Sequence, residues 1–310
     1  MSLSETFNPR KTLKLIELDK EFELFKKLFV KNMLPKIILF SGEKGNGKFT
    51  LINHLMHYYF DNDNYDINNK VIIKKNKFFT KYFENLFPNI FYLEGSNFKN
   101  IKIEEIRSLK QQLNKTSLVN KKRFIILDDV ETFNLNCLNS LLKMIEEPYE
   151  NDHFILINNN TKKLIDTIKS RSLEIKIILN KRKKNEISSK LIEYYNQKTL
   201  LDKDLVSVSP GNFLKFNYMF NYKKWNLNNH YIELLKSILS LYKKDKNIFY
   251  KDLIFFLTDY FLQKERNTNF KRNQHFIEER LTIFNILNNF FLYNLNQNTL
   301  LTSIQKKFNG

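Results

Sequence analysis

The sequence contains no alanine, and glycine, proline and cysteine are almost as scarce, with six, five and one among 310 residues. The single thiol, Cys137, excludes an intramolecular disulfide and any zinc site built from several cysteines, and it fits a cytoplasmic protein. His54 and His57 share a helix face but have no acid or thiol at ligand spacing, so no metal site is predicted. The N-terminus lacks the apolar core of a signal peptide, and no apolar run reaches membrane-spanning length. We therefore expect a cytoplasmic protein without zinc and without a membrane segment.

Positive charge is abundant: 51 Lys and Arg face 33 Asp and Glu, which gives a net charge of +18. Such an excess is typical of proteins that work near nucleic acid. However, the residues that crowd this chain, namely Lys, Asn, Ile, Phe and Tyr, are those of A/T-rich codons. Genome composition thus supplies part of the excess, and the charge supports a nucleic-acid partner only in combination with other features.

A glycine-rich loop follows the first predicted strand, residues 37–40. It reads Ser-Gly-Glu-Lys-Gly-Asn-Gly-Lys-Phe-Thr over residues 41–50 and contains the G-x-x-x-x-G-K spacing of a phosphate-binding loop, with a helical pattern after it. In such a loop backbone N–H groups cradle phosphate oxygens, and the lysine reaches the terminal phosphates. The sequence predicts binding of ATP or ADP here, through Gly42, Gly45, Gly47, Lys48 and Thr50.

Phe49 departs from the pattern of a hydrolysing enzyme, because a Ser or Thr normally follows the lysine and holds Mg²⁺. Thr50 comes one residue later, and one residue of helix rotates a side chain by about 100°. We therefore do not expect Thr50 to face a metal ion, and magnesium-dependent hydrolysis is not predicted. The alternative to nucleotide binding is a glycine loop with a purely structural role.

Polar residues stand at the ends of two further predicted strands. An apolar run from Phe124 ends in Asp128 and Asp129, and the strand at 153–157 ends in Asn158-Asn159-Asn160. In open parallel sheets ligands bind outside the carboxyl ends of the strands, so Asp128, Asp129 and Asn158 are also predicted to bind nucleotide. The stretch after the two acids is predicted to be an amphipathic helix over 134–147, with Leu135, Leu138, Leu142 and Ile145 on one face.

The order of these elements predicts an α/β fold, a parallel sheet with helices on both faces. Further strands are predicted at 71–75, 89–93 and 173–179, and further helices at 13–30 and 103–113. The basic run 180–184 reads as a linker, and the pattern from 222 onward is helical. The predicted domains are a P-loop domain at 1–179, a small helical lid at 180–221 and an all-helical domain at 222–310. The segment 74–87 receives no functional prediction.

Several short motifs are similar to those of a known family. These are Asn8-Pro9-Arg10, the Asn-Ser-Leu-Leu-Lys run at 139–143 with Glu-Glu-Pro at 146–148, and Asp-Thr-Ile-Lys-Ser-Arg-Ser at 166–172. Over residues 8 to about 215 the chain resembles the delta-prime subunits of the bacterial DNA polymerase III clamp loader, which are AAA+ proteins. The resemblance implies an AAA+ module, a lid and a C-terminal helical collar through which subunits form a ring. It also implies gamma/tau and delta subunits, the sliding clamp and, through the assembled complex, primer-template DNA as partners.

The resemblance also implies particular site residues. Compared with the motor subunit gamma/tau, Phe49 replaces a hydroxyl residue, Asp129 replaces a glutamate, and Gly211 replaces the arginine by which the lid senses phosphate. Each departure disfavours hydrolysis. Arg171 is implied as the catalytic residue in trans, reaching ATP that a neighbouring gamma/tau subunit holds. The alternative is an ordinary surface arginine.

Three functional hypotheses follow. The first is a clamp-loader subunit that organises the ring, completes a neighbour's ATPase site and helps to load the clamp onto primed DNA. The second is an ATP-hydrolysing AAA+ motor, either gamma/tau-like or another replication ATPase. The third is an AAA+ relative that acts only as an interaction scaffold. The sequence leaves open whether the chain has ATPase activity of its own.

Overall fold

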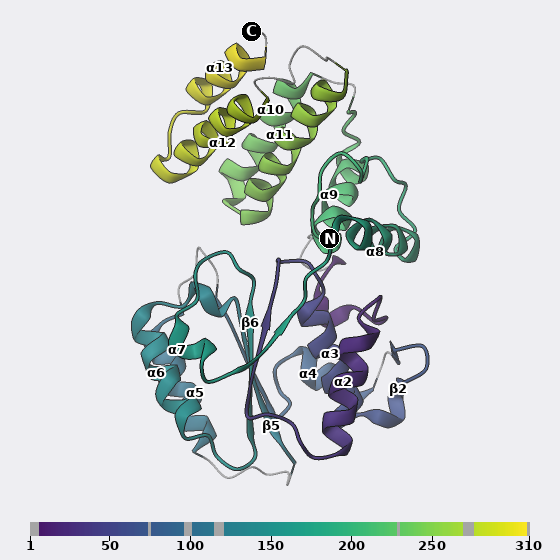
Figure 1. Cartoon of the computed structure of the whole chain (residues 1–310), viewed down its shortest axis with the longest axis vertical. Coiled ribbons are helices and arrows are strands. Elements are labelled where there is room, and N and C mark those ends of the chain that lie inside the picture. The colour runs from purple at the N-terminus through teal and green to yellow at the C-terminus, as the bar shows by residue number, and fades with distance from the viewer. Residues whose placement is uncertain are drawn as a thin grey trace. The chain divides into compact units, whose positions relative to one another are not determined.

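The computed structural model describes residues 6–73, 76–95, 101–114, 121–227, 230–268 and 276–308. The chain forms two compact units (Figure 1). One, which we call the sheet unit, contains Met1–Lys183 together with Ser209–Asn212; the other, the helical unit, contains Lys184–Val208 and Phe213–Gly310. The predicted three-part division, with a boundary between lid and collar at 221, stays a prediction.

The sheet unit is built on five parallel strands in the order β4-β5-β6-β1-β7. Because all five run the same way, their carboxyl ends lie together at one edge. The register pairs Ser41, the last residue of β1, with Asn158, the last residue of β6, and it pairs Glu94 with Asp128. The strands are β1 Ile37–Ser41, β4 Ile90–Glu94, β5 Arg123–Asp128, β6 Asp152–Asn158 and β7 Leu173–Lys176.

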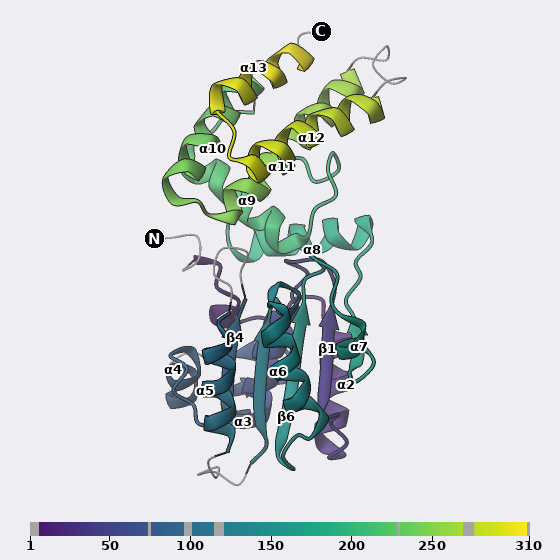
Figure 2. The same ribbon diagram turned by 90° about the vertical axis from the view of Figure 1, so that its left-hand side faces the viewer.

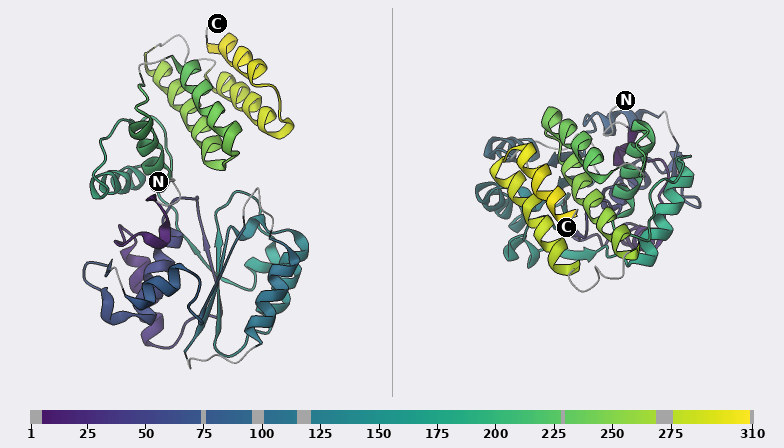
Figure 3. Two further views of the ribbon diagram at one scale, coloured as in Figure 1. Left: turned by 180° about the vertical axis from the view of Figure 1, so that it is seen from behind. Right: turned by 90° about the horizontal axis from the view of Figure 1, so that it is seen from above.

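Helices cover both faces of this sheet (Figures 1 and 2). One face carries α2 Asp19–Val30, α3 Lys48–Phe60 and α4 Lys77–Phe83, and the other carries α5 Ile103–Leu113, α6 Leu135–Glu146 and α7 Asp166–Lys169. Alternate residues of a strand enter the two apolar cores: Ile38 and Phe40 belong to the first, and Leu39 belongs to the second. The back view in Figure 3 shows the same layers. The predicted α/β fold class is confirmed.

Some predicted element boundaries are wrong. The first long helix begins at Asp19 rather than 13, because Glu17 has a φ of 63° and the N–H of Leu15 donates to the Lys70 carbonyl. The strand predicted at 71–75 is not part of the main sheet: β3 Val71–Ile72 pairs antiparallel with β2 Tyr65–Asp66, and residues 74–75 lie outside the described ones. The described part of this unit also contains three short 3₁₀ turns: η1 Pro9–Lys11, η2 Asn62–Asn64 and η3 Val130–Thr132.

Three other predictions need correction. The basic run 180–184 is not a linker, since α8 Lys181–Tyr194 begins within it, with the Asn180 side chain accepting from the Lys183 N–H. On α6, Leu135 is 63% exposed, whereas Leu138, Leu141 and Ile145 are buried. The last strand is also shorter than predicted and ends at Lys176.

The helical unit contains the remaining helices, except that the first residues of α8 and α9, up to Lys183 and Asn212, belong to the sheet unit. α10 packs on α11, α11 on α12, and α12 on α13. The Tyr231 hydroxyl lies 2.7 Å from the Thr258 hydroxyl in the core, and Arg280 pairs with Asp259 at 2.6 Å. The predicted C-terminal helical region is confirmed, and within the described ranges no helix is long and apolar enough to cross a membrane. These helices are α9 Pro210–Lys223, α10 Tyr231–Asp245, α11 Ile248–Thr268, α12 Phe276–Tyr293 and α13 Gln297–Phe308.

Candidate functional site

The glycine-rich loop joins β1 to α3 at the carboxyl edge of the sheet. Gly42, Gly45 and Gly47 all have positive φ, at 146°, 95° and 89°, which is a backbone conformation that other residues rarely adopt. A Cβ added to Gly42 would also stand 2.4 Å from the Ile177 carbonyl oxygen. The loop therefore depends on its glycines for its own folding, whatever it binds.

Lys48, the first residue of α3, is bound to the loop that precedes it. Its side chain is buried, and Nζ donates to the carbonyl oxygens of Gly42 at 2.6 Å and Glu43 at 2.9 Å. Burial lowers the pKa of Lys48 to about 8, against the opposing influence of nearby Asp128. The ammonium group that would reach terminal phosphates is engaged with backbone carbonyls of its own loop.

Phe49 takes part in an aromatic cluster. Its ring packs edge-on against Tyr92 with centroids 5.3 Å apart, and only 9% of the residue is exposed. The Arg10 guanidinium lies 3.8 Å from the Tyr92 ring centroid and 5.7 Å from that of Phe49, and it donates to the Asn85 side chain at 2.7 Å. A packed ring thus stands where a metal-holding hydroxyl would be required, and Thr50 is half-buried in the next position.

The two acids at the end of β5 are held by protein groups. Lys44 Nζ pairs with Asp129 Oδ2 at 2.7 Å, and the Asn159 amide donates to Asp129 Oδ1 at 2.6 Å and to Asp128 Oδ1 at 3.2 Å. Burial raises the pKa of Asp128 to about 7, and the neighbouring carboxylates of Asp129 and Glu94 add to the rise. Asp128 therefore takes up a proton more readily than an ordinary carboxyl.

Asn159 was missed by the sequence reasoning, which selected Asn158. The Asn158 side chain instead accepts from the Asn160 N–H at 2.9 Å, so binding of nucleotide by Asn158 stays a prediction. Glu131 was also missed: it is buried, and its Oε1 accepts from the Asn159 N–H at 3.0 Å and the Thr161 hydroxyl at 2.8 Å. The run of three asparagines was the only available signal.

The start of α9 packs directly on the glycine-rich loop. The Gly211 N–H donates to the Gly45 carbonyl at 3.0 Å, and the Ser209 hydroxyl donates to the Lys44 carbonyl at 2.6 Å. A Cβ at Gly211 would lie 2.9 Å from the Gly45 oxygen, closer than ordinary contact. In this arrangement residue 211 has no room for a side chain, which gives a physical reason for the glycine that the resemblance identifies in place of the phosphate-sensing arginine of gamma/tau.

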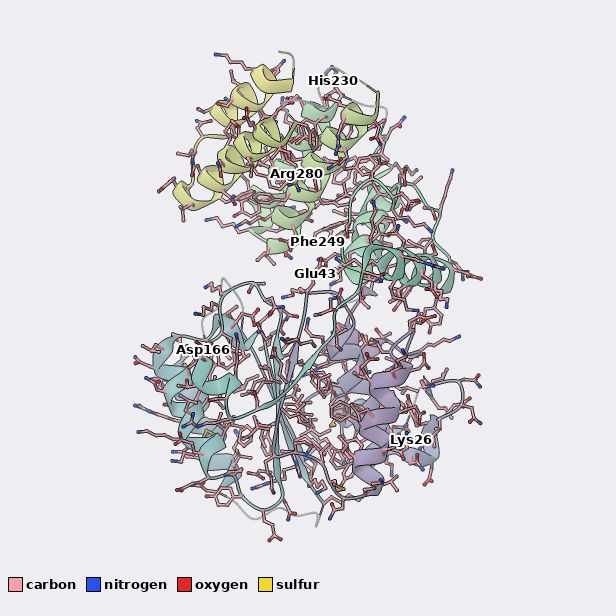
Figure 4. The ribbon with its side chains drawn as sticks, viewed as in Figure 1. Lys26, Glu43, Asp166, His230, Phe249 and Arg280 are labelled. Carbon is pink, nitrogen blue, oxygen red and sulfur yellow. The ribbon has the colours of Figure 1, made fainter. Side chains whose placement is uncertain are left out.

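Arg171 lies away from this loop, on the turn between α7 and β7. Leu173 of β7 pairs with Ile38, whereas the glycine loop follows Ser41, which pairs with Lys176. Those three residues of strand span roughly 10 Å, and Arg171 lies beyond Leu173 on the far side. Figure 4 likewise places Glu43, in the loop, and Asp166, at the start of α7, in different parts of the sheet unit. Arg171 is therefore not positioned to serve its own loop.

The Arg171 side chain is partly exposed and held by two groups. Its Nη2 pairs with Glu146 Oε1 at 2.8 Å, and its Nη1 donates to the Thr167 carbonyl at 3.1 Å. The backbone is fixed by a bond from the Arg171 N–H to the Ile168 carbonyl at 3.2 Å, and the Ser172 hydroxyl donates to that same carbonyl at 3.0 Å. The backbone is thus held within its own turn, whereas the side chain is held by one surface ion pair and one hydrogen bond.

No metal centre is evident in the parts of the chain that the structure describes: no three His, Cys, Asp or Glu side chains gather where they could hold an ion. His54 and His57 are buried; His54 bonds to the Tyr65 hydroxyl at 3.1 Å, and His57 lies among aromatic rings. Cys137 is buried too, and its Sγ donates to the Ile101 carbonyl at 3.2 Å.

Comparison with known proteins gives consistent matches. A family model described as "DNA polymerase III, delta subunit" matches residues 18–180. DNA polymerase III subunit delta' of Pseudomonas aeruginosa is 32% identical over 88 residues, covering 28% of this chain and 27% of that protein. The same subunit of Bacillus subtilis is 37% identical over 71 residues, covering 23% of this chain and 22% of that protein. The matches thus span about a quarter of the length of these curated relatives.

Among solved structures, the chain is similar to a DNA polymerase III gamma subunit-related protein of Thermotoga maritima. The two share 17% identity with a TM-score of 0.45, over 91% of this chain and 96% of that one. The RuvB Holliday junction branch migration motor of the same organism matches with 14% identity and a TM-score of 0.42, over 76% of this chain and 81% of that one.

Proposed function

Because this chain belongs to the DNA polymerase III delta subunit family, whose members are clamp-loader-type AAA+ proteins, we propose that it is a delta-prime subunit acting as a non-hydrolysing stator. In this role it stands in a ring with gamma/tau and delta subunits in the cytoplasm, and it presents Arg171 to ATP held by a neighbouring gamma/tau subunit. The ring then opens the sliding clamp and places it on primer-template DNA.

The observation that carries this proposal is the state of the chain's own phosphate loop. Lys48 is bonded to two carbonyls of that loop, and the next residue, Phe49, is packed into the aromatic cluster. A motor needs that lysine on the terminal phosphates and a hydroxyl on Mg²⁺. The close backbone contact between Gly45 and Gly211 further supports a loop without a phosphate-sensing arginine.

The position of Arg171 supports action in trans. It lies at the amino end of β7, away from its own loop, and 40% of its side chain is exposed. A guanidinium brought to a neighbour's nucleotide would neutralise charge that develops on the transferred phosphoryl group. This chain would supply that charge, while ATP and Mg²⁺ would be held by the neighbour.

Turnover by the purified chain tests the proposal against a hydrolysing motor, the alternative that the G-x-x-x-x-G-K spacing favours. We expect no release of phosphate above background when the chain is incubated with ATP and Mg²⁺, because neither Lys48 nor residue 49 is available to the phosphates. Turnover that Lys48→Ala abolishes would show that the chain is a motor and would reject the stator role.

A further inference from the structure

The contacts of Arg171 suggest that a second residue controls it. Glu146 is the last residue of α6, and its Oε1 lies 2.8 Å from Arg171 Nη2. Both side chains are partly exposed, at 47% for Glu146 and 40% for Arg171, so neither is locked in place by packing. The ion pair and the bond to the Thr167 carbonyl together fold the guanidinium back onto the surface of its own subunit.

A phosphate oxygen and the Glu146 carboxylate would compete for the same N–H groups. Arginine binds phosphate and carboxylate through the same planar fork of donors. A paired carboxylate also cancels the positive charge that a finger must bring to the transition state. The Arg171 backbone is fixed by its bond to Ile168, so the side chain must leave Glu146 in order to reach across to another subunit.

We propose that Glu146 is a positioning residue that restrains Arg171 on this chain's own surface and so limits its delivery to the neighbour's ATP. This inference rests on the proposed function, because it concerns the same arginine. An exposed ion pair contributes little free energy, so its removal is expected to change the rate by about two- to five-fold. That is enough to adjust the activity of a neighbouring site without abolishing it.

The test uses the complex reconstituted from this chain with the gamma/tau and delta subunits of the same source, and it measures DNA-stimulated ATPase at varied ATP concentrations. We expect Glu146→Gln to raise kcat/KM by about two- to five-fold, because it keeps the shape of the side chain and removes its charge. Glu147→Gln is the matched control, because it removes the same charge one residue away. Glu147 is also exposed, and it is not among the described contacts of Arg171. It should leave the rate unchanged.

A double variant separates restraint of Arg171 from a general effect on stability or charge. In an Arg171→Ala background, Glu146→Gln should have no effect, since Glu146 acts only through that arginine. If Arg171→Ala lowers the ATPase but Glu146→Gln lowers it too or leaves it unchanged, the restraint is rejected and the stator role stands. If Arg171→Ala has no effect, the proposed function itself fails, and the restraint fails with it.

Discussion

At the scale of single residues, two positions in and beside the glycine loop differ from those that a hydrolysing motor needs. Phe49 and Gly211 would be defects in a motor, yet each makes a specific contact here: the ring with Tyr92 and Arg10, and the glycine with the Gly45 backbone. The sequence identified both positions as departures but could not give their partners. Phe49 on α3 meets Tyr92 on β4, and Gly211 meets Gly45 from a distant part of the sequence. Only the folded structure brings each pair together.

Phe49→Ser tests the structural role of the ring. We expect the free energy of unfolding to fall by about 2–4 kcal/mol, because the serine leaves a cavity beside Tyr92, and we expect no ATP turnover, since Lys48 stays bonded to its own loop. Urea unfolding and a phosphate-release assay measure the two effects. Leu24→Ser, at a 47% exposed position on α2, is the control and should change stability by less than about 1 kcal/mol. A gain of turnover in Phe49→Ser would contradict the account.

At the scale of elements, apolar patterns predicted the buried strands and the helices that cover them, because burial on one face or both leaves a periodic signal. Boundaries set by local polar contacts were not predictable in the same way. The basic run at 180–184 was read as a linker, yet an Asn180 cap starts α8 there. Likewise Val71 lies in a two-strand hairpin because it pairs with Asp66, which no periodicity reveals.

The helix α3 carries two buried histidines, and β6 carries a third, which makes the sheet unit sensitive to acid. Burial lowers the pKa of His54 to about 3 and those of His57 and His153 to about 4. These pKa values lie below the value of 6.5 in the unfolded chain. Between pH 6.5 and 4 the unfolded chain therefore binds more protons than the folded chain, and the free energy of unfolding falls as pH falls. Asp128, with its pKa raised to about 7, has the opposite effect: below pH 7 the folded chain binds a proton there more tightly than the unfolded chain does, which raises the free energy of unfolding as pH falls.

The three histidines outweigh Asp128 and Asp152, whose pKa burial also raises, so we expect the free energy of unfolding to drop by about 2 kcal/mol per pH unit near pH 5. Urea unfolding at a series of pH values measures this slope. His57→Phe should make it shallower, since both His57 ring nitrogens are without a hydrogen-bond partner within the described residues and the side chain already lies among Phe78 and Tyr82. An unchanged slope in that variant would contradict the assignment.

At the scale of the whole molecule, the sequence predicted the order of parts: a P-loop sheet unit followed by a helical region. The sequence also indicated Arg171 through a short motif. The distance between Arg171 and the glycine loop, however, follows from the pairing of β7 with β1, which only the structure gives. The contacts of Asn159 and Glu131 could not be predicted, because they arise where the tips of β5 and β6 meet. In the proposed function Arg171 therefore acts on a neighbour's ATP, whereas Lys48 takes no part in hydrolysis.

The most direct test compares those two residues in one assay, the DNA-stimulated ATPase of the complex reconstituted with gamma/tau and delta subunits. We predict that Arg171→Ala lowers turnover at the neighbouring site by at least about tenfold, since arginine fingers contribute about 10³ to 10⁵ in well-studied cases. Lys48→Met, which keeps the length of the side chain but removes its charge, should leave the rate of the assembled complex unchanged. The reverse pattern, in which Lys48→Met abolishes turnover and Arg171→Ala has no effect, would contradict the account.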